Sequence, residues 1–559
     1  MQEKELSENV SENTQTTIPP ASIQRGGTGL QLYTGQWTDT QALHLARRTL
    51  FGATVADVKF LTGISMNQAV NYLLTIPNSQ PASPLKSYTN STTSGDQDAA
   101  ISQGSTWVDI NTTDGGVNAK RRQSLKNWWI GLMLNQERNI LEKMVLFWHN
   151  HFATETNDIG KAIWCYQNNV TIRKNALGNF KEFVKNITVD TGMLRYLNGY
   201  LNTKSAPDEN YGRELQELFT VGKGIDGATQ TYSESDVKAA ARVLTGWSID
   251  GTNNIGVFNS NKHDITDKVF SAFYKNKTIK GRNANNAGVL ELDDLVNMIC
   301  EADETALHMC RKLYRWFVYY DINDATETNV IIPLAQVFKS NNYNIVPVLS
   351  ALFKSEHFFD PLNQGCVIKN PMDFIAGFSR VFLLQFPLPS DFANNYIMWQ
   401  YLQTNGLFQQ QNIGDPPAVA GWPAYYQLPQ MHELWINSDT LPKRNQFCDI
   451  LINTGYTRAS KTLKVDPILF AQSLSNPADP NILIRDAVRY LLALPLSPES
   501  LVQIKKDILL GGQISDHYWS DAWTKYLNTP GDKANTEIVK SKLSSLYHYL
   551  TSQPEYQLS

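Results

Sequence analysis

Apolar residues recur every three or four positions along most of this chain, which is the spacing of an amphipathic helix. Several of these segments open with residues that cap helices. Thr54 precedes the apolar run 55–61, Ser65 precedes the run 69–74, and Asn370-Pro371 opens a further segment. The pattern predicts a mainly α fold, a large multi-helix globular domain with long irregular loops.

One stretch departs from the helical spacing. Residues 248–290 contain Asp250-Gly251 and Asn253-Asn254 next to short alternating runs such as 269–274. Turn residues between short alternating runs are typical of hairpins. We therefore expect a small β-hairpin insert at about 248–290.

The chain has 559 residues, more than one hydrophobic core usually organises. Residues 1–36 are rich in Ser, Thr, Asn and Gly and predict a flexible or draped arm. We expect a helical core with the β insert over 37–440 and a C-terminal helical subdomain, packed on that core, over 441–559. The arm is a candidate contact for a protein partner.

Composition narrows the classes of partner and compartment. Charged residues make up only 18% of the chain and the net charge is −4. The chain therefore has no excess of basic residues, and we do not expect nucleic acid as its main partner. No apolar run approaches the ~18 residues of a transmembrane helix, and the first residues lack the apolar segment of an export signal. The five cysteines form no Cys-x-x-Cys pair, so buried free thiols are the expected state.

Two histidines stand at the end of a predicted helix, in the sequence Trp148-His149-Asn150-His151-Phe152. In a helix, residues two apart point about 200° away from each other, so the imidazoles could not serve one site. In an extended segment they would share a face, as metal-binding His-x-His pairs do. Without a metal, one histidine would cap the helix and the other would belong to the core. Both interpretations are open.

A helix expected over 209–219 carries the densest acidic cluster. Glu209 and Arg213 fall on its solvent side, four residues apart, and predict an exposed ion pair. Glu214 and Glu217 lie on one flank of the apolar face. Glu214 is closest to the core, so its carboxylate needs a donor, a cation or a metal as partner.

His263-Asp264 in the β insert offers a third metal ligand or a general base, with turn formation as the plain alternative. A divalent metal ion is the candidate cofactor of such a site. The candidate metal ligands are His149, His151 and His263, and the candidate catalytic residues are Glu214, Glu217, Arg213 and Asp264.

Other polar and aromatic groups have plain interpretations. Arg47 and Arg48 follow His44 by one turn, which predicts helix-end packing and solvated charge. Trp422 and Tyr425 belong to a Pro-rich loop and could line a glycan-binding cleft. The chain has no phosphate-binding loop, dinucleotide fingerprint, nucleophile elbow or His-Glu-x-x-His motif.

A series of motifs runs through the chain in fixed order: His44-Leu-Ala-Arg47-Arg48-Thr-Leu-Phe51-Gly52, Phe147-Trp-His-Asn-His-Phe152, Glu209-Asn-Tyr-Gly-Arg213-Glu214-Leu-Gln-Glu217, Leu244-Thr-Gly-Trp247, His263-Asp264, Lys369-Asn-Pro371, Gly421-Trp422-Pro423 and Trp435-Ile-Asn437. From about residue 40 to 550 the chain resembles the bacterial family called domain of unknown function 1800. The resemblance implies a predominantly helical fold and export to the periplasm or cell surface, although this sequence shows no export signal. It implies no particular reaction.

Two classes of function follow. One is an enzyme, hydrolytic or oxidative and dependent on a metal or a His/Glu pair, acting on an exported polymer or glycan. The other is a non-catalytic protein of the cell surface, either an assembly scaffold or a glycan-binding protein.

Overall fold

A computed structural model describes residues 25–76, 79–89, 98–224 and 231–559. Helices dominate these residues, so the predicted mainly α fold is confirmed. Up to the β insert the helices are α1 (Asp39–Thr49), α2 (Val55–Thr62), α3 (Met66–Leu73), α4 (Gly115–Leu134), α5 (Leu141–His151), α6 (Thr156–Ile159), α7 (Ala162–Asn175), α8 (Phe180–Thr188), α9 (Thr191–Tyr196), α10 (Glu209–Glu214) and α11 (Glu234–Val243).

The chain beyond the insert is again helical. It contains α12 (Ala287–Glu301), α13 (Asp303–Phe317), α14 (Asp324–Thr326), α15 (Ile332–Ser340), α16 (Ile345–Phe353), α17 (Pro371–Val381), α18 (Phe392–Phe408), α19 (Thr440–Asp449), α20 (Pro467–Ser473), α21 (Pro480–Leu491), α22 (Pro498–Ile504), α23 (His517–Asn528) and α24 (Lys533–Thr551).

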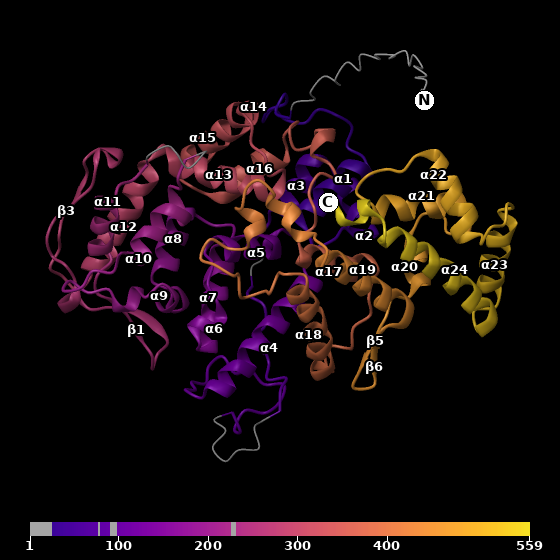
Figure 1. Cartoon of the computed structure of the whole chain (residues 1–559), viewed down its shortest axis with the longest axis horizontal. Helices are drawn as coiled ribbons and strands as arrows, with labels where there is room; N and C mark the ends of the chain where they lie inside the picture. The colour runs from indigo at the N-terminus through magenta and orange to yellow at the C-terminus, as the bar shows by residue number, and fades with distance from the viewer. Residues whose placement is uncertain (1–24, 77–78, 90–97, 225–230) are drawn as a thin grey trace, which may run out of the picture.

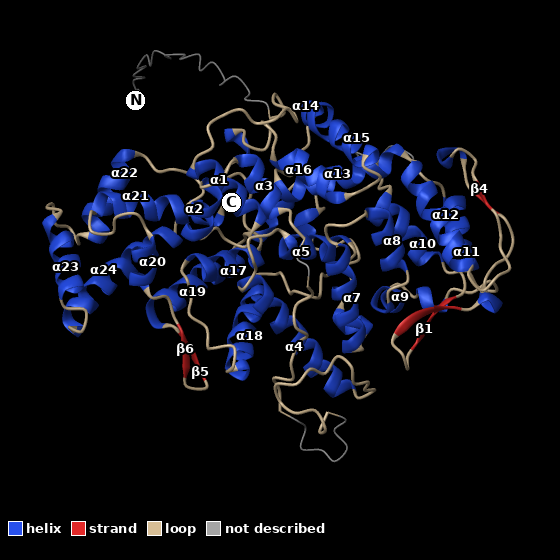
Figure 2. Ribbon diagram, turned by 180° about the vertical axis from the view of Figure 1, so that it is seen from behind, coloured by secondary structure: helices blue, strands red, loops and turns tan. Residues whose placement is uncertain are grey.

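These helices form an elongated body (Figures 1 and 2). Helices α8 to α12 lie at one end and α20 to α24 at the other, while α1, α5, α16 and α17 lie between them. The functional residues considered below come from the middle of this body and from the end that carries the insert.

Local capping chemistry sets several helix starts. The Thr54 side chain accepts from the Asp57 N–H while Asp57 bonds back to Thr54, and Ser65 and Gln68 do the same for α3. Asn370 caps α17, which has Pro371 in its first turn, where a missing N–H costs nothing. The sequence predicted each of these starts.

Six short strands pair into antiparallel hairpins: β1 (Trp247–Asp250) with β2 (Ile255–Phe258), β3 (Lys268–Val269) with β4 (Thr278–Ile279), and β5 (Tyr456–Arg458) with β6 (Lys461–Leu463). The first two hairpins confirm the β insert. The third lies in a segment expected to be only helical. Ala459 and Ser460 form its two-residue turn at φ 48° and 61°. The sequence does not predict this turn, because two-residue turns of this kind usually contain Asn-Gly and this one contains Ala-Ser.

Buried apolar side chains form one cluster that includes residues of both predicted parts of the chain. Phe447 of α19 lies against Phe378 of α17, with ring centroids 5.3 Å apart, and Tyr547 of α24 lies 5.5 Å from Phe382. A boundary at residue 440 stays a prediction. All five cysteines are free thiols. None of the described helices combines the length and apolar character that a bilayer span requires.

Residues 25–36 are draped along the segment after α16. The Tyr33 N–H donates to the Lys354 carbonyl, and the N–H groups of Glu356 and His357 donate to the carbonyls of Gln31 and Gly29. Residues 1–24 of the expected arm lie outside the described residues, and its role in partner binding stays a prediction.

Candidate functional site

Helix α5 continues through His151 and ends at Phe152. His149 and His151 are therefore both helical, and the extended arrangement that would place them on one face does not occur. His149 lies edge-on to the rings of Trp129 and Trp422, and its Nε2 has no hydrogen-bond partner among the described residues. Burial lowers the pKa of His149 to about 4, so the ring is neutral at pH 7.

His151 belongs to a different environment. Its Nε2 lies 3.0 Å from the Phe219 carbonyl oxygen and its Nδ1 lies 3.0 Å from Lys312 Nζ. A carbonyl only accepts, so Nε2 carries the hydrogen and Nδ1 accepts from Lys312. Phe219 lies in a π-helical segment, η2 (Leu215–Thr220), which continues α10. The histidine and the lysine thus bind the end of this segment.

The acidic helix separates its charges as expected. Arg213 forms an ion pair with Glu209 at 3.5 Å and two hydrogen bonds of 2.7 and 2.6 Å to Glu234. Glu217 accepts from the Tyr232 hydroxyl at 3.0 Å and pairs with Lys223 at 2.5 Å. Arg213 and Glu217 thus have partners at the surface of the body.

Glu214 is half-buried and has no hydrogen bond or ion pair with the described residues. Burial, followed by repulsion from Glu217, raises the pKa of Glu214. Its position at the core border agrees with the expectation from helical geometry. The charges of Arg213 and Lys223 oppose this rise in part, but neither forms an ion pair with Glu214.

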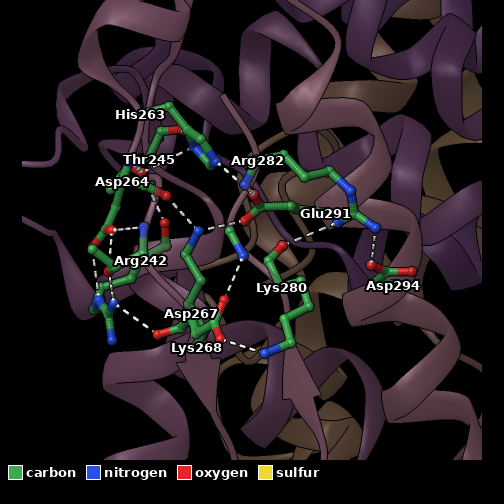
Figure 3. Close-up of polar contacts among 12 residues, drawn as sticks. Arg242, Thr245, His263, Asp264, Asp267, Lys268, Lys280, Arg282, Glu291 and Asp294 are labelled. Atoms are coloured by element: carbon green, nitrogen blue, oxygen red, sulfur yellow. Dashed lines mark hydrogen bonds and ion pairs between the residues drawn. The ribbon is translucent and has the colours of Figure 1, made fainter. Parts of the chain in front are cut away.

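His263 and Asp264 tie the β insert to its flanking helices (Figure 3). His263 Nδ1 lies 2.8 Å from the Thr245 carbonyl, and its Nε2 lies 3.1 Å from Glu291 of α12. Glu291 also accepts from Lys268 Nζ at 2.5 Å, and the His263, Lys268 and Glu291 side chains are all fully buried.

Asp264 binds Arg242 of α11 at 2.7 Å. Burial raises the pKa of Asp264, but the hydrogen bonds from Arg242 and Thr266 outweigh it and hold this pKa well below its usual value. Both residues of the His263-Asp264 motif therefore have partners that fix the insert.

The seven candidate residues do not converge on one site. His149 lies on the central helix α5, the insert with His263 lies at one end of the body (Figure 1), and each side chain except Glu214 and His149 has its own partner. Within the described ranges, no group of three or more His, Cys, Asp or Glu side chains could hold a metal ion.

A different set of residues surrounds a narrow pocket in the middle of the body. We call it the central pocket. Its walls come from α1, α5, α13, α17, the segment before α17, and the short helices η7 (Pro423–Tyr425) and η8 (Met431–Trp435). Its charged and aromatic lining residues are Arg47, Arg48, Lys143, Arg315, Trp316, Tyr320, Asp373, Tyr425, His432 and Trp435.

Cations outnumber carboxylate side chains around the central pocket. Lys143 forms an ion pair with Asp373, the one acidic side chain of the lining. Arg47, Arg48 and Arg315 form no ion pair with any described residue and bind backbone carbonyls instead. Burial, then Arg48, lowers the pKa of Arg47 to about 10, so its guanidinium stays charged at pH 7. Three guanidinium groups of the lining thus have no ion-pair partner in the described part of the chain.

Arg48 contradicts the expectation of solvated charge, because only 4% of it is exposed. It lies on the same helical face as His44 and Leu45, which are also buried. Its Nη2 donates to the Asn363 carbonyl at 3.0 Å, while its Nε has no partner among the described residues. A buried charge of this kind is costly unless it is paired.

Two further donors of the lining lack acceptors within the described part of the chain. His432 Nδ1 accepts from the Ile368 N–H at 3.3 Å, which leaves the hydrogen of the neutral ring on Nε2, and this buried Nε2–H has no acceptor. The Tyr425 hydroxyl is likewise buried, and its hydrogen has no acceptor among the described residues. Burial raises its pKa and outweighs the side-chain contacts of Asn370 and Gln411, so it keeps its proton. Arg48, His432 and Tyr425 together suit an oxyanion.

A family model described as "Protein of unknown function (DUF1800)" matches residues 44–558, nearly the whole chain. The chain belongs to this family. No curated protein and no solved structure matches it.

Motifs that resemble those of the family meet at the central pocket although they are far apart in sequence. Arg47 and Arg48 come from the first motif, Asn370 from Lys369-Asn-Pro371, and Trp435 from Trp435-Ile-Asn437. Tyr425 follows Gly421-Trp422-Pro423 by two residues. The sequence predicted Tyr425 as a cleft-lining residue but did not predict the cationic residues around it, although Arg48 on the apolar face of α1 was a visible signal.

Proposed function

We propose that this member of the DUF1800 family binds a ligand through an oxyanion group, a carboxylate, phosphate or sulfate, in the central pocket. One observation carries the proposal: three guanidinium groups without a carboxylate partner line a pocket that also holds unpartnered buried donors. Bound oxygen atoms would accept from Arg48 Nε, His432 Nε2 and the Tyr425 hydroxyl. Each buried donor left without an acceptor costs about 1–3 kcal/mol, which a bound anion would recover.

The aromatic wall suggests that the ligand also has a flat or apolar part. The rings of Trp316 and Tyr425 are stacked with centroids 4.3 Å apart. Trp435 is 3% exposed and packs edge-on behind Tyr425, with ring centroids 5.7 Å apart. Such a wall beside cationic groups suits an acidic sugar or another anionic ring. Trp422 itself is 1% exposed and cannot present its ring to a glycan.

This proposal favours ligand binding among the functions considered from the sequence. The hydrolytic or oxidative reaction on an exported polymer, the divalent metal and the scaffold role stay predictions. An acidic glycan end group in the central pocket is compatible with either an enzyme or a binding protein.

Binding of acetate, phosphate and sulfate, measured by calorimetry and by the rise in Tm at constant ionic strength, tests the proposal. We expect saturable binding of at least one anion, and at least tenfold weaker binding by Arg48→Met. Arg458→Met, at the exposed end of β5, is the matched control and should bind as the native chain does.

Tyr425→Phe keeps the ring and removes only the hydroxyl, so it tests the site even if Arg48→Met does not fold. Weaker anion binding by Tyr425→Phe supports the proposal. Absence of saturable binding of all three anions, or native affinity in both pocket variants, would overturn it.

A further inference from the structure

A second narrow pocket, which we call the side pocket, adjoins the central one. The two pockets share Arg47, Asp373 and Ser559 as lining residues. One wall of the side pocket exists because the turn after α1 approaches α17 closely. A Cβ on Gly52, whose φ is +73°, would lie 2.7 Å from the Gly377 Cα. Only glycine fits there.

The side pocket has a cation of its own. Lys369 Nζ donates to the Tyr556 carbonyl at 2.6 Å and lies 4.3 Å from the centre of the Tyr556 ring. It forms no ion pair with the described residues. Burial, then the nearby Arg47, lowers the pKa of Lys369 to about 7, so its charge changes near neutral pH.

The shared wall does not repel anions strongly. Its carboxylate, Asp373, is paired with Lys143 and accepts from Asn370 Nδ2 at 2.8 Å. Arg47 stays charged between the two pockets and binds only backbone carbonyls. Positive groups therefore stand in the central pocket, on the shared wall and in the side pocket.

We infer that the ligand carries two anionic groups, one held by Arg48 and His432 in the central pocket and the other by Lys369 in the side pocket. This inference rests on the proposed anion-binding function. Dicarboxylates, bisphosphates and doubly charged acidic oligosaccharides share this chemistry. A second anionic group on the same molecule meets Lys369 at a high effective concentration, so it raises affinity without any change at the first group.

Alkane α,ω-disulfonates of increasing chain length, compared with methanesulfonate, test this inference because sulfonates keep their charge near neutral pH. We expect one disulfonate length to bind at least tenfold more tightly than methanesulfonate. Lys369→Gln should remove this gain and leave methanesulfonate affinity within twofold. Lys464→Gln, at an exposed position beyond β6, is the control. Succinate and pyrophosphate extend the test to carboxylates and phosphates.

A pH series on the native protein gives an independent measurement. As pH rises from 6 to 8.5, Lys369 loses its proton, so the gain for the disulfonate should shrink while methanesulfonate binding changes little. Equal affinities for mono- and disulfonates at every length, or an equal loss of both in Lys369→Gln, would overturn the inference. Failure of methanesulfonate, acetate and phosphate alike to bind would instead overturn the anion-binding function itself.

Discussion

His149 and His151 lie two residues apart, yet their imidazoles have different roles in stability. His151 donates to the Phe219 carbonyl and accepts from Lys312, whereas His149 Nε2 bonds to no described residue. His151→Phe should therefore lower the free energy of unfolding by about 1–3 kcal/mol, because it leaves the buried Phe219 carbonyl without its donor and Lys312 with only its contact to the Leu218 carbonyl. His149→Phe should change it by less than about 1 kcal/mol.

Urea unfolding of the two variants measures this difference directly. They are matched, since each replaces one buried imidazole of α5 by a phenyl ring. Equal destabilisation by both substitutions would contradict the assigned contacts. Tight metal binding that either variant abolishes would restore the metal hypothesis for that histidine.

For single residues, the sequence predicts contacts within one helical turn but not contacts between distant parts of the chain. Helical geometry placed Glu209 and Arg213 in an ion pair and Glu214 at the core border, because these relations depend only on residues within one turn. The central pocket depends instead on contacts such as the one from Arg47 to the Leu492 carbonyl, 445 residues away. Local spacing holds no information on such contacts, so the sequence alone predicts a solvated Arg48.

At the scale of elements, the β insert depends on a buried ionic network. Glu291 of α12 accepts from Lys268, whose side chain is fully buried. Glu291→Gln would leave Lys268 charged without a counter-ion, and breaking a buried pair in this way costs about 3–5 kcal/mol. We expect residues 247–291 to lose protection in hydrogen exchange before the rest of the chain does.

The exposed pair between Lys277 and Glu301 provides the control in the same insert. Both side chains are more than one third exposed, so Lys277→Ala should cost less than about 1 kcal/mol. Unchanged exchange of the insert in Glu291→Gln would show that β1 to β4 are held mainly by apolar contacts such as that of Trp247 with Phe258.

The sequence predicts helices and strands correctly where the signal lies within a few residues. It fails where a turn contains residues that are unusual for its backbone conformation. The capping boxes of α2 and α3 place the helix starts correctly because a hydroxyl and a side chain three residues later bond reciprocally. The β5–β6 hairpin was missed because its turn places Ala459 and Ser460 at positive φ, where glycine or asparagine is usual. The π-helical segment η2 also has no recognised sequence signal here.

At the scale of the whole molecule, burial of histidines couples stability to pH. Six of the nine histidines have a pKa lowered, mainly by burial: His44, His149, His151, His308, His357 and His432. Their folded pKa lies below the unfolded value of about 6.5. The stability that they contribute is thus fully present above pH 6.5 and is lost as pH falls through the folded values, which are about 4 for His149 and His432.

Between pH 6.5 and 4 these histidines bind protons in the unfolded chain but stay neutral in the folded chain. The free energy of unfolding should therefore fall steeply on acidification. Each such histidine contributes up to about 1.4 kcal/mol per pH unit, and the lowered pKa of His149 corresponds to about 3 kcal/mol in all. Urea midpoints measured from pH 7 to 4.5 test this, with His149→Phe expected to lessen the slope by about one proton. Stability that stays constant or rises over that interval would contradict the neutral, buried state of these rings.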